Sequence, residues 1–209
     1  MTRVYIILLL LILIFHTVNA QNITVIVKSV RIGNQIWMTE NVNMPIFNNG
    51  ESILHAQADQ EWEEAGFKKT PAWCYQSMDT ISAPFQRPKL YNRYVINDNK
   101  NVCPVGWHVA TNKDWDALVN YYKGQAVAGK YLKAGSWKDS IKYNHIFNAV
   151  PVGWRDVGFG DFGSQANWWS KDTTVDGANY YYFIFSNASN VVKYNTSWIN
   201  GFSIRCVKD

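Results

Sequence analysis

Tryptophan, amide and charged side chains gather in the last third of the chain, where they could bind a sugar. These residues are Trp154, Arg155, Asp156, Asn167, Trp168, Trp169, Trp198 and Asn200. An exposed indole offers a flat apolar surface for the C–H face of a sugar ring, and the polar neighbours can hydrogen-bond its hydroxyls. The pattern therefore predicts a ligand-binding surface for polysaccharide or cell-surface glycan. The alternative is that the rings fill a core beneath long loops, since large aromatic side chains carry much of the burial there.

Enzymatic chemistry has less support from the same region. A glycosidase needs two carboxylates that flank the bond it cleaves. The available acids are Asp156, Asp161, Asp172 and Asp176. Their spacing does not show that any two of them face each other. Together with Asn167 and Asn179 they could offer oxygen ligands to Ca²⁺, but the EF-hand pattern is missing and solvated loop acids are the simpler interpretation.

Other catalytic and metal-binding patterns are missing from the sequence. His55, His108 and His145 lack the spacing of zinc ligands. There is no Gly-x-Ser-x-Gly or Ser-x-x-Lys nucleophile, and no glycine loop placed between a strand and a helix to hold a phosphate. We therefore expect no catalytic residue, no metal site and no cofactor, and a function in binding rather than in catalysis.

The composition and the first residues indicate one exported domain. Of the 209 residues, 47% are hydrophobic and 17% charged, and the net charge of +4 is too weak to indicate nucleic acid as a partner. Arg3, the apolar run 4–15, and the small residues Val18 and Ala20 predict a signal peptide cleaved after residue 20. The run is shorter than the about 17–25 residues that cross a bilayer. The mature part, residues 21–209, is therefore expected to be a secreted or surface domain without a membrane span.

Local patterns place helices in the middle of the chain and strands at both ends. Residues 24–30 and 35–39 are predicted to form a hairpin around a Gly-Asn turn. The clearest helix begins at Thr111, where Asp114 completes a capping box. Its apolar residues follow at helical spacing, at Trp115, Leu118, Val119 and Tyr122.

The remaining segments are predicted with fewer signals. Further helices are expected at 52–65, 90–97 and 126–133, and further strands at 70–75, 180–186, 191–194 and 202–207. Residues 153–177 have no period and predict a long irregular loop. Because helices and strands do not alternate regularly, the order favours an α+β fold.

Several stretches, taken in order, resemble one family. They are residues 27–43, Ala72-Trp-Cys-Tyr75, 91–97, Cys103-Pro-Val-Gly-Trp-His-Val109 followed by Trp115, Val150-Pro-Val-Gly-Trp-Arg155, Trp168-Trp-Ser170 and 201–209. The set is similar to the Fibrobacter succinogenes major paralogous domain and covers nearly all of residues 21–209. The resemblance implies a secreted or surface module of bacteria.

A more distant resemblance is to the formylglycine-generating-enzyme-like fold, a relative of the C-type lectin fold. It rests on residues 103–115 and on the closing Gly201-Phe-Ser-Ile-Arg-Cys206. It implies a C-type lectin-like architecture, with a small twisted antiparallel sheet, two helices and a long irregular loop region that carries any ligand site. The oxidase activity of that family needs a closely spaced cysteine pair for copper. This chain lacks such a pair, so the activity is not implied.

The three cysteines, Cys74, Cys103 and Cys206, allow three single bridges. We expect a Cys103–Cys206 disulfide that ties the start of the main helix to the last strand. Pairing of Cys74 with either of the others remains open, because the spacing does not choose between them.

The sequence therefore supports two alternative functions. One is a secreted, non-catalytic module that binds polysaccharide or cell-surface glycan. The other is a structural or protein-interaction module of the bacterial cell surface, in which the loops contact a protein partner. Exposure of the four tryptophans named first discriminates between them.

Overall fold

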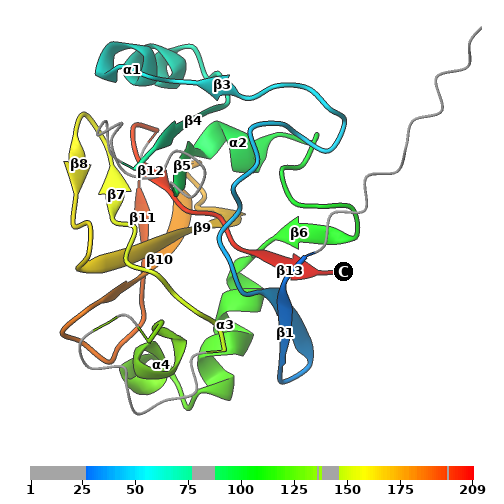
Figure 1. The fold of residues 1–209 in the computed structure, drawn as a ribbon, viewed down its shortest axis with the longest axis vertical. Helices are drawn as coiled ribbons and strands as arrows, with labels where there is room; N and C mark the ends of the chain where they lie inside the picture. Colours follow the sequence, from blue (N-terminus) through cyan, green and yellow to red (C-terminus); the bar gives the residue numbers. More distant parts are fainter. Residues whose placement is uncertain (1–26, 77–87, 136, 138–145, 197) are drawn as a thin grey trace, which may run out of the picture.

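The computed structural model describes residues 27–76, 88–135, 137, 146–196 and 198–209. Within these residues the fold is mixed α+β, with mostly antiparallel sheets and four helices (Figure 1). The helices are α1 (Asp59–Phe67), α2 (Arg93–Asn97), α3 (Asn112–Tyr121) and α4 (Gln125–Leu132). Among the helices of these described ranges, none has the length and apolar character needed to cross a membrane. The predicted signal peptide lies outside the described residues.

The strands form three sheets. The first has the order β1-β2-β13-β6, from β1 (Ser29–Ile32), β2 (Gln35–Met38), β13 (Cys206–Lys208) and β6 (Trp107–Val109). The second has the order β11-β10-β9, from β11 (Val192–Thr196), β10 (Asn179–Phe185) and β9 (Gln165–Thr173). The third has the order β3-β4-β5-β12-β7-β8, from β3 (Leu54–His55), β4 (Ala72–Tyr75), β5 (Lys89–Asn92), β12 (Gly201–Phe202), β7 (Trp154–Arg155) and β8 (Phe159–Gly160).

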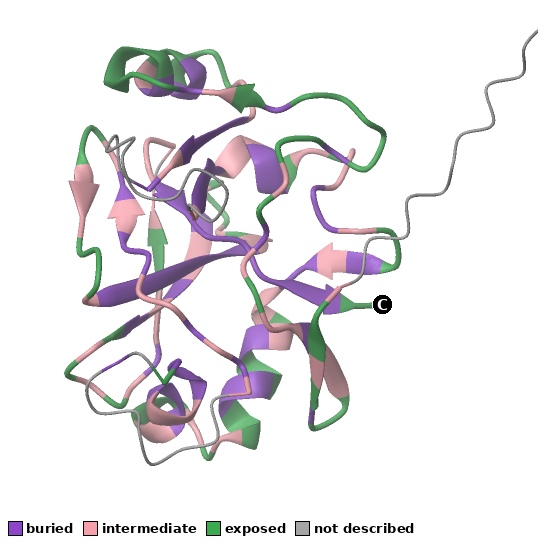
Figure 2. Cartoon of the chain, in the orientation of Figure 1, coloured by how far each residue is buried: buried purple, intermediate pink, exposed green. Residues whose placement is uncertain are grey.

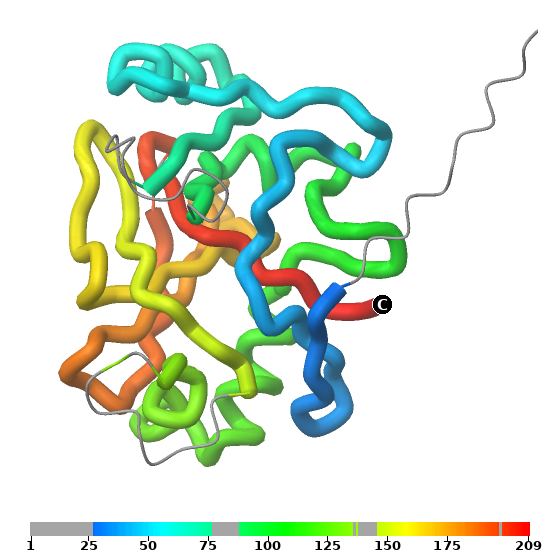
Figure 3. The backbone as a smooth tube through the Cα atoms, in the orientation of Figure 1, coloured from blue at the N-terminus to red at the C-terminus, as the bar shows by residue number. Residues whose placement is uncertain are grey.

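The predicted N-terminal hairpin is confirmed, but its first strand is β1 (Ser29–Ile32) and not 24–30; residues 24–26 lie outside the described residues, and residues 27 and 28 precede the strand. Ile32 pairs with Gln35 across a two-residue turn, and Gly33 adopts the positive φ of +59° that this turn requires. The last strand, β13, then pairs with β2 through Val207 and Trp37. The first and last described strands thus lie in one sheet, and the C-terminal segment crosses the molecule to reach it (Figure 3).

Helix α3 is confirmed together with its capping box. The Thr111 side chain accepts from the Asp114 backbone N–H, and the Asp114 carboxylate accepts from the Thr111 backbone N–H at 2.9 Å. Trp115 and Leu118 are buried in the largest core cluster, which packs α3 and α4 against β9 and β10 (Figure 2). The Trp115 ring lies 5.1 Å from that of Tyr182 and 5.6 Å from that of Trp168.

Two predicted helices are partly wrong. Residues 52–58 are not helical, because Leu54 and His55 pair in parallel with β4 as strand β3. Helix α1 then continues through Gly66, which had been expected to end it. This glycine admits the Trp198 ring, since a Cβ there would lie 2.5 Å from it. Likewise, the segment 90–97 is a strand, β5, followed by the short helix α2.

The irregular loop predicted at 153–177 is also wrong in its larger part. It holds β7, β8 and the nine-residue strand β9. Residues 165–170 are all buried, so both faces of β9 are covered and the sequence shows no alternation of polar and apolar residues. Strands β10 and β11 agree with prediction to within two residues.

The last predicted strand, 202–207, divides into β12 and β13, which lie in different sheets. The buried Arg205 marks the change between them. Its guanidinium donates to the carbonyls of Met38 and Phe147, both at 2.8 Å, and to Asn41 Oδ1 at 2.9 Å. These contacts tie the crossing segment to the first sheet.

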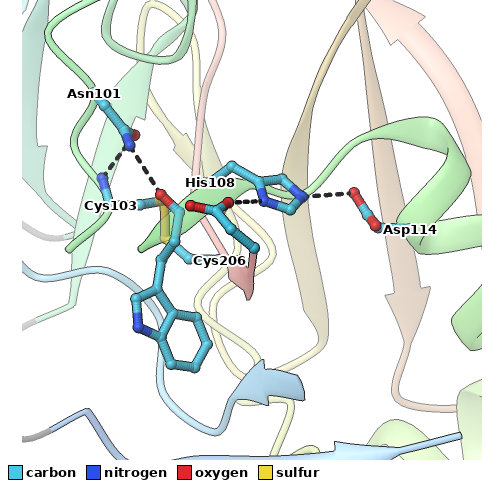
Figure 4. The surroundings of a disulfide bond; sticks show 7 residues. Asn101, Cys103, His108, Asp114 and Cys206 are labelled. Carbon is cyan, nitrogen blue, oxygen red and sulfur yellow. Dashed lines mark hydrogen bonds and ion pairs between the residues drawn. A yellow bond between two sulfur atoms is a disulfide. The ribbon is translucent and has the colours of Figure 1, made fainter. Parts of the chain in front are cut away.

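The Cys103–Cys206 disulfide is confirmed, and Cys74 remains a buried free thiol. The bridge joins the loop before β6 to β13, whose Cys206 pairs with Val109 of β6. Asn101 supports that loop, since its side chain accepts from the Cys103 N–H at 3.0 Å and donates to the Trp107 carbonyl at 2.9 Å (Figure 4).

Candidate functional site

An open cleft of about 280 Å³ lies where β7 and β12 meet the sheet of β9 and β10. It is lined by Trp154, Asp156, Gln165, Asn167, Tyr181, Asn200 and Phe202. The cleft therefore brings together four of the eight residues that the sequence assigned to a binding surface.

The strand register explains why these side chains converge. Tyr181 pairs with Trp169, Phe183 with Asn167 and Phe185 with Gln165, so these residues share one face of the β9–β10 pair. The opposite face, with Trp168 and Tyr182, packs on α3. The cleft consequently occupies the side of the sheet that no helix of the main core covers.

The other wall comes from β7 and β12. Gly201 of β12 pairs with Arg155 of β7, which places Asn200 and Phe202 beside Trp154 and Asp156. Helix α1 holds the turn that precedes β12, because the Trp62 indole N–H donates to the Ile199 carbonyl at 2.8 Å. Trp62 also lies against Gly201, where a Cβ would come within 2.6 Å of its ring.

The indole of Trp154 is held firmly at the cleft. Its N–H donates to Asp161 Oδ2 at 2.9 Å, and its ring covers Gly160. Trp154 is half-buried. One part of the ring therefore packs against β8 while another part lines the cleft.

The amides at the base of the cleft are ordered by each other and by the backbone. Gln165 Nε2 donates to Asn167 Oδ1 at 2.9 Å, and Asn167 Nδ2 donates to the Gly153 carbonyl at 3.1 Å. These bonds leave Gln165 Oε1 without a hydrogen-bond partner among the described residues. It is an acceptor with a fixed orientation.

Further unpaired groups surround it. Asp156 Oδ1 accepts from the Gly158 N–H at 3.0 Å, and Asn200 Oδ1 accepts from the Thr196 hydroxyl. Within the described ranges, the second carboxylate oxygen of Asp156, the Asn200 amide N–H₂ and the Tyr181 hydroxyl have no partner. Burial and the nearby Tyr194 raise the pKa of Tyr181, which keeps its hydroxyl protonated. Donors and acceptors are therefore both present, as recognition of sugar hydroxyls requires.

Two of the predicted binding tryptophans lie in the core instead. Trp168 is 1% exposed and Trp169 is 0% exposed. The Trp168 indole donates to Asn41 Oδ1 at 2.9 Å, and that of Trp169 to the Tyr91 carbonyl at 2.7 Å. The expectation that they contact a ligand is wrong, because β9 is covered on both faces and these rings carry its packing.

Two further predicted residues support the site without lining it. Arg155 is fully buried, with its guanidinium 5.0 Å from the Trp62 ring and 2.8 Å from Asp59 Oδ1. Trp198 is half-buried and packs on α1, with its ring 4.6 Å from that of Phe67. Both connect α1 to the walls of the cleft.

Sequence reasoning missed Gln165, Tyr181 and Phe202. Tyr181 had a usable signal, since alternation along 180–186 places it on the face opposite the buried Tyr182. Gln165 and Phe202 had no such signal, because their role depends on pairing between strands distant in sequence.

The geometry offers few groups for catalysis. Asp156 is the one carboxylate among the described residues that line the cleft. Burial raises the pKa of the Cys74 thiol to about 11, against a smaller opposing effect of Arg155, while Cys103 and Cys206 are bonded to each other. No group of three or more His, Cys, Asp and Glu side chains in the described part of the chain is placed to hold a metal ion.

Comparison with known families gives one match. The model of the Fibrobacter succinogenes major domain matches residues 30–208. The chain belongs to this family. The match includes every residue that lines the cleft and both cysteines of the disulfide. No curated protein and no solved structure matches the chain. In this Fibrobacter succinogenes major domain, the cleft combines aromatic rings with unpaired hydrogen-bonding groups.

Proposed function

We propose that this protein is a secreted, non-catalytic module that binds polysaccharide or cell-surface glycan in the cleft between β7, β12 and the β9–β10 pair. The observation that supports this most is the lining itself. Trp154 and Tyr181, both half-buried, provide apolar surfaces beside unpaired groups of Gln165 and Asn200, and the buried Phe202 closes the base of the cleft. The C–H face of a sugar can pack on the two half-buried rings while its hydroxyls pair with the oriented polar groups, which make up the larger part of the lining.

The wider proposal extends to architecture and location. The family to which the chain belongs, the signal-like residues 1–20 and the disulfide support export to an oxidising compartment. The small antiparallel sheets with helices packed on them are consistent with the C-type lectin-like architecture that we propose. The proposed ligand site is formed by residues at the end of β7 and the start of β12 and by those that face them from β9 and β10.

The test is a glycan array followed by pull-down with insoluble polysaccharides. We expect the intact protein to bind and Trp154→Ala to lose binding, because Trp154 presents its ring to the cleft. Tyr121→Ala is the control, since Tyr121 is an exposed aromatic residue of α3 outside the lining. A folded protein that binds no glycan would exclude the proposal.

A second candidate, a structural or protein-interaction module of the cell surface, is favoured by one observation. Trp168 and Trp169 are buried, so two of the four tryptophans expected to contact a glycan cannot do so. Under this alternative, Trp154→Ala leaves function intact and no sugar competes with the protein partner.

A further inference from the structure

We infer that the ligand is a neutral, extended polysaccharide chain, which continues from the cleft along an aromatic strip on β10 and β11. This inference rests on the proposed function and specifies its ligand class. The strip consists of Tyr181, Phe183, Phe185 and Tyr194.

The aromatic strip is continuous with the cleft. Tyr181 lines the cleft, and its ring lies 5.5 Å from that of Phe183, which lies 5.4 Å from that of Phe185. Tyr194, on the paired strand β11, lies 6.3 Å from Tyr181. Phe185 is 40% exposed and Tyr194 is 62% exposed, so the strip is open to solvent at both of these rings.

The length of the strip requires a polymer. Alternate residues of a strand are about 6.7 Å apart, so Tyr181 and Phe185 are separated by about 13 Å. A single sugar in the cleft cannot reach both rings. Because the three β10 rings follow a single strand, an extended chain can stay in contact with them, whereas a helically coiled chain would curve away.

The chemistry of the surroundings selects a neutral chain. The residues paired with the strip are Gln165, Asn167, Trp169 and Val192, none of which is charged. Lys193 lies on the opposite face of β11, where its ammonium is 4.7 Å from the Tyr180 ring. The carboxylate of Asp156 in the cleft would repel an acidic polysaccharide, and the nearby Arg155 is fully buried.

The experiment measures how affinity depends on chain length. Cello-, xylo- and manno-oligosaccharides of two to six units are titrated into the full protein by calorimetry. We expect affinity for at least one series to rise at least tenfold from disaccharide to hexasaccharide. Phe185→Ser should abolish that rise. Phe183→Leu keeps an apolar side chain but removes the ring, so it should reduce the gain in affinity from disaccharide to hexasaccharide. Tyr121→Ser, an exposed aromatic on α3, is the control.

The outcomes separate this inference from the proposed function. Disaccharide binding with no gain from longer chains would overturn the extended site and keep the cleft as a glycan site. An unchanged rise in Phe185→Ser would overturn the role of the strip. Binding to acidic but not neutral chains would overturn the charge argument. Failure to bind any neutral chain overturns the inference, and a negative glycan array overturns the proposed function as well.

Discussion

Replacing Gly160 with alanine should displace the Trp154 ring and weaken ligand binding. A Cβ at Gly160 would lie 2.3, 2.5 and 2.9 Å from three carbons of that ring. Carbon atoms in favourable contact are about 3.5–4.0 Å apart, so the ring must move by about 1 Å or more. That movement stretches the 2.9 Å bond to Asp161 and changes the wall of the cleft. Overpacking of this kind costs about 1–3 kcal/mol of stability.

Gly158→Ala is the matched control. No atom lies within 4 Å of a Cβ at Gly158, and neither glycine has a positive φ, so backbone strain does not enter the comparison. Urea unfolding should show a lower free energy of unfolding for Gly160→Ala alone. Glycan affinity should fall about tenfold or more, equivalent to about 1.4 kcal/mol, again for Gly160→Ala alone. Equal stability and equal affinity in the two variants would refute the assigned position of Trp154.

Three further predictions concern the disulfide, His108 and the turn before Asn200. Reducing the Cys103–Cys206 bond, which spans 103 residues, should lower the free energy of unfolding by about 4.7 kcal/mol in the chain-entropy model; a reductant-insensitive urea midpoint would contradict this. Burial alone would lower the pKa of His108. The hydrogen bonds and charges of Asp209 and Asp114 together outweigh this effect, so the pKa of His108 is raised. The stability from His108 is thus complete below its unfolded pKa of about 6.5 and is lost as pH rises through the folded pKa. Urea unfolding of His108→Gln should lack this loss, and the same pH slope in both proteins would count against it. Trp62→Phe loses the hydrogen bond to the turn before Asn200, so it should weaken glycan binding while the far-ultraviolet circular dichroism spectrum stays that of the folded protein. Unchanged affinity would show that other contacts hold the turn.

Elements with local determinants could be predicted from the sequence. The Gly-Asn turn of the first hairpin needs only a positive φ, and α3 needs only its cap and a stripe of apolar residues. Both are specified by neighbours a few positions apart. The Cys103–Cys206 bond depends on residues far apart in the sequence, and cysteine spacing alone does not distinguish it from the two alternative pairings.

Elements that depend on distant partners could not be predicted. Strand β9 looks irregular because it is buried on both faces, and Trp168 and Trp169 therefore resembled loop tryptophans. Gly66 looked like the end of a helix, whereas it accommodates the Trp198 ring from the other end of the chain.

The candidate site divides in the same way. Trp154, Asp156, Asn167 and Asn200 were found from residue type, because exposed aromatics beside amides suggest sugar binding. Type alone did not separate them from Arg155, which has the same neighbours in sequence but points into the core. Only the pairing of β7 with β12 makes that distinction.

The most direct test of the glycan-binding cleft is a ¹H–¹⁵N spectrum of the tryptophan indoles during titration with a neutral hexasaccharide. Spectra of Trp154→Phe, Trp168→Phe and Trp169→Phe assign the relevant signals. We expect the Trp154 signal to shift on binding, because this residue lines the cleft, while the signals of the buried Trp168 and Trp169 keep their positions. A Trp154 signal that stays fixed in the presence of saturating sugar would exclude the cleft as the glycan site.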